Sequence, residues 1–121
     1  TAQAGQKWMF RIKSTGEPAV AVWGGYAQGT LPVADNQWHH IAAVLDGDGM
    51  PTVDEIQFYV DGQFQTAVAN STQQINTSDG EQVYLGVLDT GTLQNHFKGL
   101  LDDIRIYNRA LTAEEIAAIA N

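Results

Sequence analysis

Cysteine is absent from the 121 residues of this chain. Its absence excludes disulfide bonds, thiol catalysis and zinc sites with cysteine ligands. No apolar run approaches the ~20 residues that a membrane-spanning helix needs, and no charged segment followed by an apolar one marks a signal peptide. Basic residues are scarce, since six Lys and Arg stand against 14 Asp and Glu, for a formal net charge of −8. That balance argues against nucleic acid and anionic membranes as partners.

The length and the apolar content predict a single globular domain over residues 1–121. Hydrophobic residues make up 44% of the chain, which excludes a disordered or fibrous class. A chain of this size buries roughly two-thirds of its unfolded surface, so one real core is expected.

Short alternating runs of apolar and polar residues, broken by Gly, Asp and Asn, predict a fold made of strands. The runs lie at residues 7–13, 19–23, 36–46, 56–60, 63–68, 83–88 and 97–107. In the last run, Leu100, Asp102, Ile104 and Ile106 share one face. The pattern is typical of an antiparallel sandwich or barrel, with the longest loops expected at 24–36, 46–55 and 69–81.

Local signals also locate a hairpin, a buried strand and a helix. Asp61-Gly62 suits a type I′ turn, so residues 63–68 are expected to return antiparallel to 56–60. Residues 41–46 are apolar on both faces, as in a central strand covered on two sides. Thr112 and Glu115 form a capping box that starts one short helix, with Ile116 and Ile119 as its apolar stripe.

Three segments share their order and spacing with a known family. They are WHHIAAVLDG at 38–47, FYVDG at 58–62 and FKGLLDDIRIYNRALTAEEI at 97–116. Together they resemble the laminin G-like, concanavalin A-like jelly-roll modules common in bacterial secreted proteins. The resemblance implies an all-β fold, with two antiparallel sheets packed face to face, one short C-terminal helix over one end, and a secreted or cell-surface location.

The same resemblance implies a binding function. Modules of this family mainly carry carbohydrate-binding or adhesive surfaces, so we expect a lectin-like module that binds a polysaccharide or glycan. Its work would be to target an attached or partner protein to that glycan outside the cell. The alternative is a structural or adhesive module whose ligand is a protein. Residues 1–7 have no counterpart of the family's usual N-terminal strands, and an unpaired sheet edge invites pairing. Either the sequence is a trimmed domain of a parent multidomain chain, or a homodimer or a docked partner chain is expected to complete the sandwich.

Asp102 has two interpretations. Because Asp102 lies on the same strand face as Leu100, Ile104 and Ile106, it is predicted to point into an apolar environment. Burial of an unpaired carboxylate there would cost much free energy. Either it accepts hydrogen bonds from neighbouring backbone amides, or it ligates the structural calcium ion that such modules often carry. The other acidic turns, Asp46-Gly47-Asp48-Gly49 and Asp79-Gly80-Glu81, are interpreted as solvated loops.

Aromatic side chains decide where a sugar is expected to bind. An exposed Trp or Tyr offers a flat platform, and Asn, Asp or Gln then hold the hydroxyls. Trp23 and Tyr26 border the Gly24-Gly25 turn and are the first platform candidates. Tyr84, Asn95 and His96 come next. Trp8, Phe10 and Trp38 are interpreted as core residues, and the adjacent His39 and His40 as packing and hydrogen-bonding residues.

No motif for catalysis is present. The concanavalin A-like glycosidases carry paired carboxylates on one strand as Glu-x-Asp-x-x-Glu, and no such run exists in this sequence. There is no Gly-x-Ser-x-Gly elbow, no His-Glu-x-x-His and no Gly-rich phosphate loop before a helix. We therefore expect a domain that is not an enzyme.

Overall fold

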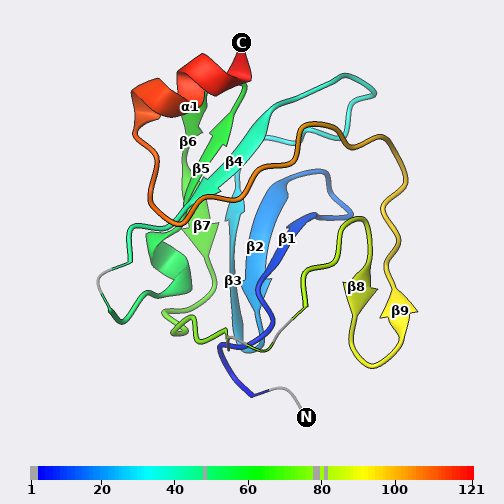
Figure 1. Ribbon diagram of the computed structural model, residues 1–121, viewed down its shortest axis with the longest axis vertical. Helices are drawn as coiled ribbons and strands as arrows, with labels where there is room; N and C mark the ends of the chain where they lie inside the picture. Colours follow the sequence, from blue (N-terminus) through cyan, green and yellow to red (C-terminus); the bar gives the residue numbers. More distant parts are fainter. Residues whose placement is uncertain (1–2, 48, 78–79, 81) are drawn as a thin grey trace.

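The computed structural model describes residues 3–47, 49–77, 80 and 82–121 and shows two stacked antiparallel sheets (Figure 1). The predicted turn residues Asp48, Asp79 and Glu81 lie outside the described residues. The four-stranded sheet has the order β1 (Met9–Ile12), β2 (Pro18–Val22), β3 (Gly25–Gly29), β7 (Ala67–Ala69). The three-stranded sheet has the order β4 (Ile41–Val44), β5 (Gln57–Val60), β6 (Gln63–Gln65). The remaining elements are the pair β8 (Leu88–Asp89) and β9 (Leu93–Gln94), the 3-10 helix η1 (Val53–Glu55) and α1 (Ala113–Ala120).

The main core lies between the two sheets. Phe10, Val20 and Ala27 lie side by side across β1, β2 and β3 and point toward the second sheet. There Phe58 of β5 is fully buried, and its ring centroid lies 6.4 Å from that of Phe10. Burial of one such side chain stabilises the fold by roughly 1.5–3 kcal/mol. The predicted two-sheet β-sandwich is therefore confirmed.

A second cluster forms on the other face of the three-stranded sheet, under α1. Val44 and Tyr59 pack there against Ile116, which is only 1% exposed. The capping box is present, because Thr112 Oγ1 accepts from the Glu115 amide at 3.2 Å and Glu115 Oε1 accepts from the Thr112 amide at 3.0 Å. The predicted helix and its position over one end of the sandwich are thus confirmed.

The predicted hairpin is also present. Asp61 has φ +52° and Gly62 has φ +80°, and these two positive values characterise a type I′ turn between β5 and β6. The returning segment is not one strand, because β6 stays in the three-stranded sheet whereas β7 joins the four-stranded sheet. The chain therefore crosses between the sheets at Thr66.

The loop predicted at residues 24–36 is wrong, because β3 occupies its first part. This strand is poor in apolar residues since its glycines admit close neighbours. A Cβ on Gly25 would lie 2.5 Å from Ser71 Oγ, and one on Gly29 would lie 3.2 Å from Pro18 Cγ. Close packing at these glycines therefore holds β3 in place, although the strand lacks the alternation of apolar and polar residues that predicts a strand from sequence.

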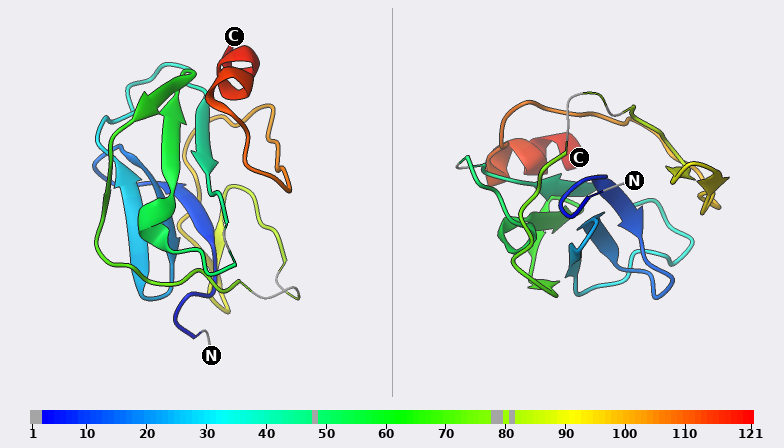
Figure 2. Two further views of the ribbon diagram at one scale, coloured as in Figure 1. Left: turned by 90° about the vertical axis from the view of Figure 1, so that its left-hand side faces the viewer. Right: turned by 90° about the horizontal axis from the view of Figure 1, so that it is seen from below.

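The strand predicted at residues 97–107 is wrong as well. No described residue there belongs to a strand, and every residue from 90 to 109 is exposed. Asp103 has φ +51°, a left-handed conformation that interrupts an extended run. Figure 2 shows residues 95–109, hereafter the strap, arching over the sheets as an irregular segment. Of the predicted strand at 83–88, only Leu88 belongs to a strand.

The strand at 41–46 is covered on two sides but is not central. Ala43 packs on the core between the sheets and Val44 packs under α1. In the order β4-β5-β6, however, β4 is the edge strand. No residue of the strap belongs to a strand, so the strap does not pair with this edge.

Candidate functional site

The outer face of the four-stranded sheet, the face turned away from the second sheet, carries the first candidate residues. Ala21 pairs with Tyr26, and Ala19 pairs with Gln28, across β2 and β3. Directly paired residues point to the same side of a sheet. Since the alternating residue Val20 points into the core, Tyr26 and Gln28 stand together on the outer face.

Polar groups around Tyr26 come from β3 itself and from the residues that directly follow β1 and β7. Its backbone N–H donates to Asn70 Oδ1 at 2.8 Å. The ammonium of Lys13 lies 5.4 Å from the centre of the Tyr26 ring and donates to Gln28 Oε1. Besides the Tyr26 hydroxyl, the polar groups that these side chains offer a ligand include the N–H groups of Lys13, Gln28 and Asn70. A half-buried aromatic ring framed by donors suits the face and the oxygen atoms of a sugar.

Sequence reasoning found Tyr26 but missed its polar neighbours. Gln28 could have been predicted from the sequence, because it lies two residues from Tyr26 on the same strand and therefore on the same face. Lys13 and Asn70 could not. Lys13 reaches Tyr26 through the register of the consecutive strands β1, β2 and β3, and Asn70 through the pairing of β3 with the distant strand β7.

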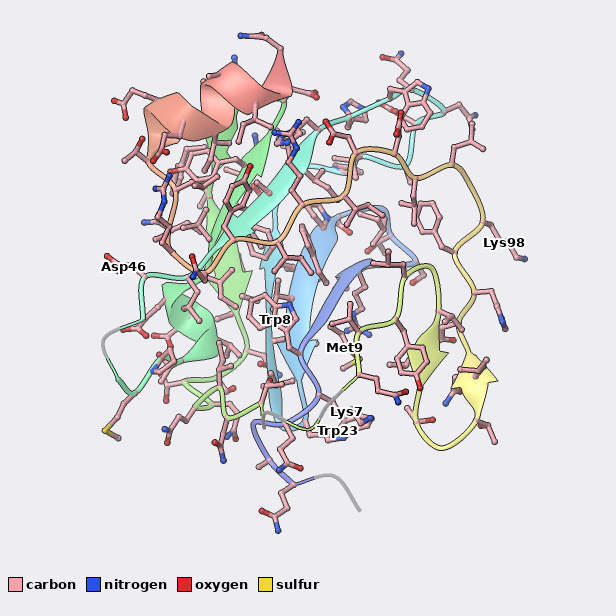
Figure 3. The ribbon with its side chains drawn as sticks, viewed as in Figure 1. Lys7, Trp8, Met9, Trp23, Asp46 and Lys98 are labelled. Carbon is pink, nitrogen blue, oxygen red and sulfur yellow. The ribbon has the colours of Figure 1, made fainter. Side chains whose placement is uncertain are left out.

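Trp23 lies in the turn between β2 and β3 and is half-buried. Its backbone is held by the N-terminal segment, since its N–H donates to Gln6 O at 2.8 Å and its carbonyl accepts from the Gly5 amide at 2.6 Å. Its indole Nε1 is buried, with no hydrogen-bond partner among the described residues. Figure 3 shows it at the bottom of the sheet, beside Lys7 in this view. Trp23 therefore lies at most at the end of the surface around Tyr26.

The other candidates line a second surface. An open groove of about 2560 Å³ lies between the strap, β1 and β4, and Tyr84, Asn95, His96 and Asp102 are among its lining residues. Trp8 lies on the sheet side of this groove and Lys98 on the strap (Figure 3). The structure thus separates Trp23 and Tyr26 from the remaining four candidates.

Three aromatic residues interpreted as core are exposed instead. Trp38 is 65% exposed, and Trp8 and Phe10 are partly uncovered, although the last does face the core. All three line the groove. They are uncovered because the strap stands away from the sheets instead of lying on them as a strand.

Asp102 does not point into an apolar environment. It is exposed, and its Oδ1 accepts from the Asp103 amide at 2.8 Å. Among the described residues, no group of three or more His, Cys, Asp or Glu side chains is arranged to hold a metal ion. The neighbouring Asp103 carboxylate is held by Arg105, so the described residues around Asp102 do not fit a calcium site.

His39 forms a polar cluster that the sequence did not predict. Its Nδ1 lies 2.8 Å from Asp61 Oδ2, and its Nε2 lies 2.9 Å from Asp35 Oδ1. The Asp61 and Asp35 carboxylates raise the pKa of the imidazole above its ordinary value. In return, the hydrogen bonds with His39 lower the pKa of both carboxyls. The cluster joins the 35–39 segment to the β5–β6 turn and agrees with the hydrogen-bonding role expected for His39.

No described helix is long or apolar enough to cross a membrane. Among proteins with curated descriptions, none matches the sequence significantly. One solved structure is similar, that of residues 221–444 of an S-layer domain-containing protein from Clostridium thermocellum, with a TM-score of 0.53 and 20% sequence identity. The match covers 98% of this chain but 64% of the other, so the chain spans less than two thirds of that structure.

The likeness to that structure is one of fold alone. A family model described as the concanavalin A-like lectin/glucanase superfamily matches residues 1–117, nearly the whole chain, including all three segments whose spacing resembled such modules. With its two stacked antiparallel sheets, the chain belongs to the concanavalin A-like lectin/glucanase superfamily.

Proposed function

We propose that this domain is a non-catalytic carbohydrate-binding module that holds a glycan against the outer face of the four-stranded sheet. The observation that carries the proposal is the Tyr26 ring, set in a central strand and framed by Lys13, Gln28 and Asn70. Membership of a superfamily of lectins and glucanases supports it. An extracellular location, at a cell surface or in secreted form, is part of the same proposal.

A binding rather than a catalytic role agrees with the described carboxylates. Hydrolysis of a glycosidic bond uses two carboxyl groups about 5–10 Å apart on either side of the scissile bond. The three described side chains that frame Tyr26, those of Lys13, Gln28 and Asn70, are not carboxylates. Such a surface can hold a sugar without providing an acid or a nucleophile.

A glycan and polysaccharide array tests the proposal, run once with calcium and once with chelator. The folded domain is expected to bind one class of glycan, and Tyr26→Ala is expected to remove at least ~90% of the signal, since stacking on the ring supplies most of the contact. Loss of binding in chelator would add calcium to the proposal, at a site other than the one first expected at Asp102.

Tyr84→Ala is the matched control, because it removes the same side chain from the groove. It is expected to bind as the unchanged domain does. If the folded domain binds no glycan on the array, the proposal is contradicted. Loss of binding in Tyr84→Ala with retention in Tyr26→Ala would move the site to the groove.

A further inference from the structure

Two unpaired strand edges open onto the groove beneath the strap. Among the strands of the described residues, β1 pairs only with β2, and β4 pairs only with β5. All of β1 and all of β4 line the groove, as does the whole strap from residue 95 to 109. Among the described residues, no backbone hydrogen bond joins residues 98–109 to either strand. An unpaired edge presents rows of N–H and C=O groups that an extended chain satisfies best.

The backbone groups of β4 that face the groove can be identified from the ladder. The Asp61 amide donates to the His40 carbonyl, so this pair is bonded across the strands. Hydrogen-bonded pairs alternate along an antiparallel ladder, so Ala42 bonds to Tyr59 in turn. Ile41 and Ala43 therefore turn their N–H and C=O groups outward, into the groove.

The strap is held in a shape that does not fill this edge. Asp103 is in the left-handed region, with φ +51°. Arg105 grips its carboxylate with two hydrogen bonds, Nε to Oδ1 at 2.9 Å and Nη2 to Oδ2 at 3.2 Å. Asp102 Oδ1 adds a third contact, to the Asp103 amide. These bonds lie within the strap itself, so they hold its bend without tying it to β4.

The groove also gathers the positive charge of the molecule. All six basic residues of the chain line it: Lys7, Arg11, Lys13, Lys98, Arg105 and Arg109. Arg11 and Lys98 make no ion pair within the described part of the chain. Three of the five aspartates that line the groove are already engaged, two by His39 and one by Arg105. In a chain of net charge −8, this is where a negatively charged occupant is best accommodated.

We propose that the groove is a docking site for an extended segment of another protein, which adds as a strand to the free edge of β4 and alternates apolar with acidic residues. The apolar side chains would cover the exposed groove residues Trp8, Trp38 and Ile104, and the acidic ones would face Arg11 and Lys98. This site meets the surface around Tyr26 at β1, where Lys13 contributes to both, but the docking proposal does not depend on glycan binding.

A displayed library of random peptides of about nine residues, long enough to span β4, is the probe. Selection on the folded domain is expected to enrich peptides that alternate apolar and acidic residues. Their binding is expected to protect the Ile41 and Ala43 amides from hydrogen exchange. No enrichment, enrichment of basic peptides, or protection elsewhere would overturn the proposal.

Two matched proline variants separate docking from folding. Ala43→Pro removes an N–H that faces the groove, and it is expected to abolish binding of the enriched peptides. Phe64→Pro removes an outward N–H on β6, the opposite edge of the same sheet, and is expected to leave binding intact. Thermal unfolding verifies that both variants fold.

If Ala43→Pro does not fold, the double variant Arg11→Glu/Lys98→Glu serves instead, with an expected loss of affinity of about tenfold or more. Unchanged affinity would contradict the proposal. A dimeric mass of the free domain in solution would assign the groove to a second copy of this chain. Amides at Ile41 and Ala43 that are protected in the free monomer would show that the strap itself closes the edge. Either result would overturn the proposal.

Discussion

Hydrogen bonds of a few single side chains join segments of the chain that are distant in sequence. His39 lies between Asp35 and Asp61 and so ties the segment before β4 to the turn between β5 and β6. Asp61 also accepts from the His40 amide at 2.9 Å, so one carboxylate serves the turn, the histidine and the strand entry. Removing it would release all three at once.

The His39 cluster gives the domain a stability that depends on pH. The pKa of His39 is raised above 6.5, so its contribution is complete below about pH 6.5 and is lost as the pH rises through the raised value. The pKa values of Asp35 and Asp61 are lowered below 3.8, so their contributions are complete above that pH and are lost as it falls. Stability from this cluster is therefore greatest between about pH 4 and 6.5.

Chemical denaturation between about pH 6 and 9 measures this effect. The free energy of unfolding is expected to fall across the range, and His39→Gln is expected to flatten the decline. His96→Gln, at an exposed site on the strap, is the control and should leave the slope unchanged. An equally steep decline in His39→Gln would assign the pH dependence to other groups.

Phe58 and Phe64 provide a second test at the scale of the residue. Phe58 is 0% exposed between the sheets, whereas Phe64, six residues along, is 60% exposed. Phe58→Ala is expected to lower the free energy of unfolding by about 3–5 kcal/mol, because it leaves a cavity in the core. Phe64→Ala is expected to cost less than about 1 kcal/mol. Similar losses in urea denaturation would contradict the placement of the core.

At the scale of the element, α1 is anchored at its start by three groups. The Arg109 guanidinium forms two hydrogen bonds to Glu115, of 2.9 and 2.5 Å, and Glu115 also accepts from the Thr112 amide. The Arg109 hydrogen bond, with the Thr112 amide, lowers the pKa of the Glu115 carboxyl to about 2. The stabilising contribution of Glu115 is therefore present above about pH 4.5, its ordinary pKa, and is lost as the pH falls toward 2.

Arg109→Gln is expected to raise the pKa of Glu115 toward its ordinary value, because the first cause of the shift is removed. Titration of the Glu115 side-chain carboxyl by NMR measures this directly. Arg105→Gln is the matched control, since Arg105 binds Asp103 on the strap and should not affect Glu115. A pKa that stays near 2 in Arg109→Gln would show that the capping box alone sets it.

Elements with short-range signals were predictable from the sequence, and those that depend on distant partners were not. The Asp61-Gly62 turn and the Thr112 capping box were predicted correctly because a few adjacent residues determine each of them. β3 was missed because it alternates Gly25, Ala27 and Gly29 with Tyr26 and Gln28, and it owes its burial to β2, β7 and η1. Residues 97–107 have the alternation of a strand, but without a paired neighbour Asp103 takes a left-handed turn, and the strand does not form.

The candidate site was predictable only in part, for the same reason. Tyr26 was identified by its type and by the glycines before it. Its partners Lys13 and Asn70 come from other parts of the chain, and only the register of β1, β2, β3 and β7 brings them together. Asp102 was placed in an apolar environment because a regular strand was assumed around it.

At the scale of the whole molecule, charge and shape are divided between two surfaces. The outer face of the four-stranded sheet presents Tyr26 among N–H donors. The groove on the strap side is lined by the six basic residues, of which Lys13 also belongs to the Tyr26 surface. Acidic residues dominate elsewhere and account for the net charge of −8. A domain with one surface for a glycan and another for a protein segment would suit the targeting of a partner protein to a polysaccharide.

The most direct measurement follows amide and side-chain NMR shifts while a soluble oligomer of the glycan selected on the array is added. The proposed function predicts saturable shifts centred on Tyr26, Gln28 and Asn70, with Ile41 and Ala43 in β4 unaffected. Shifts centred on Tyr84, Asn95 and His96 instead, or no saturable shift anywhere in the folded domain, would contradict a glycan site on the outer face of the sheet.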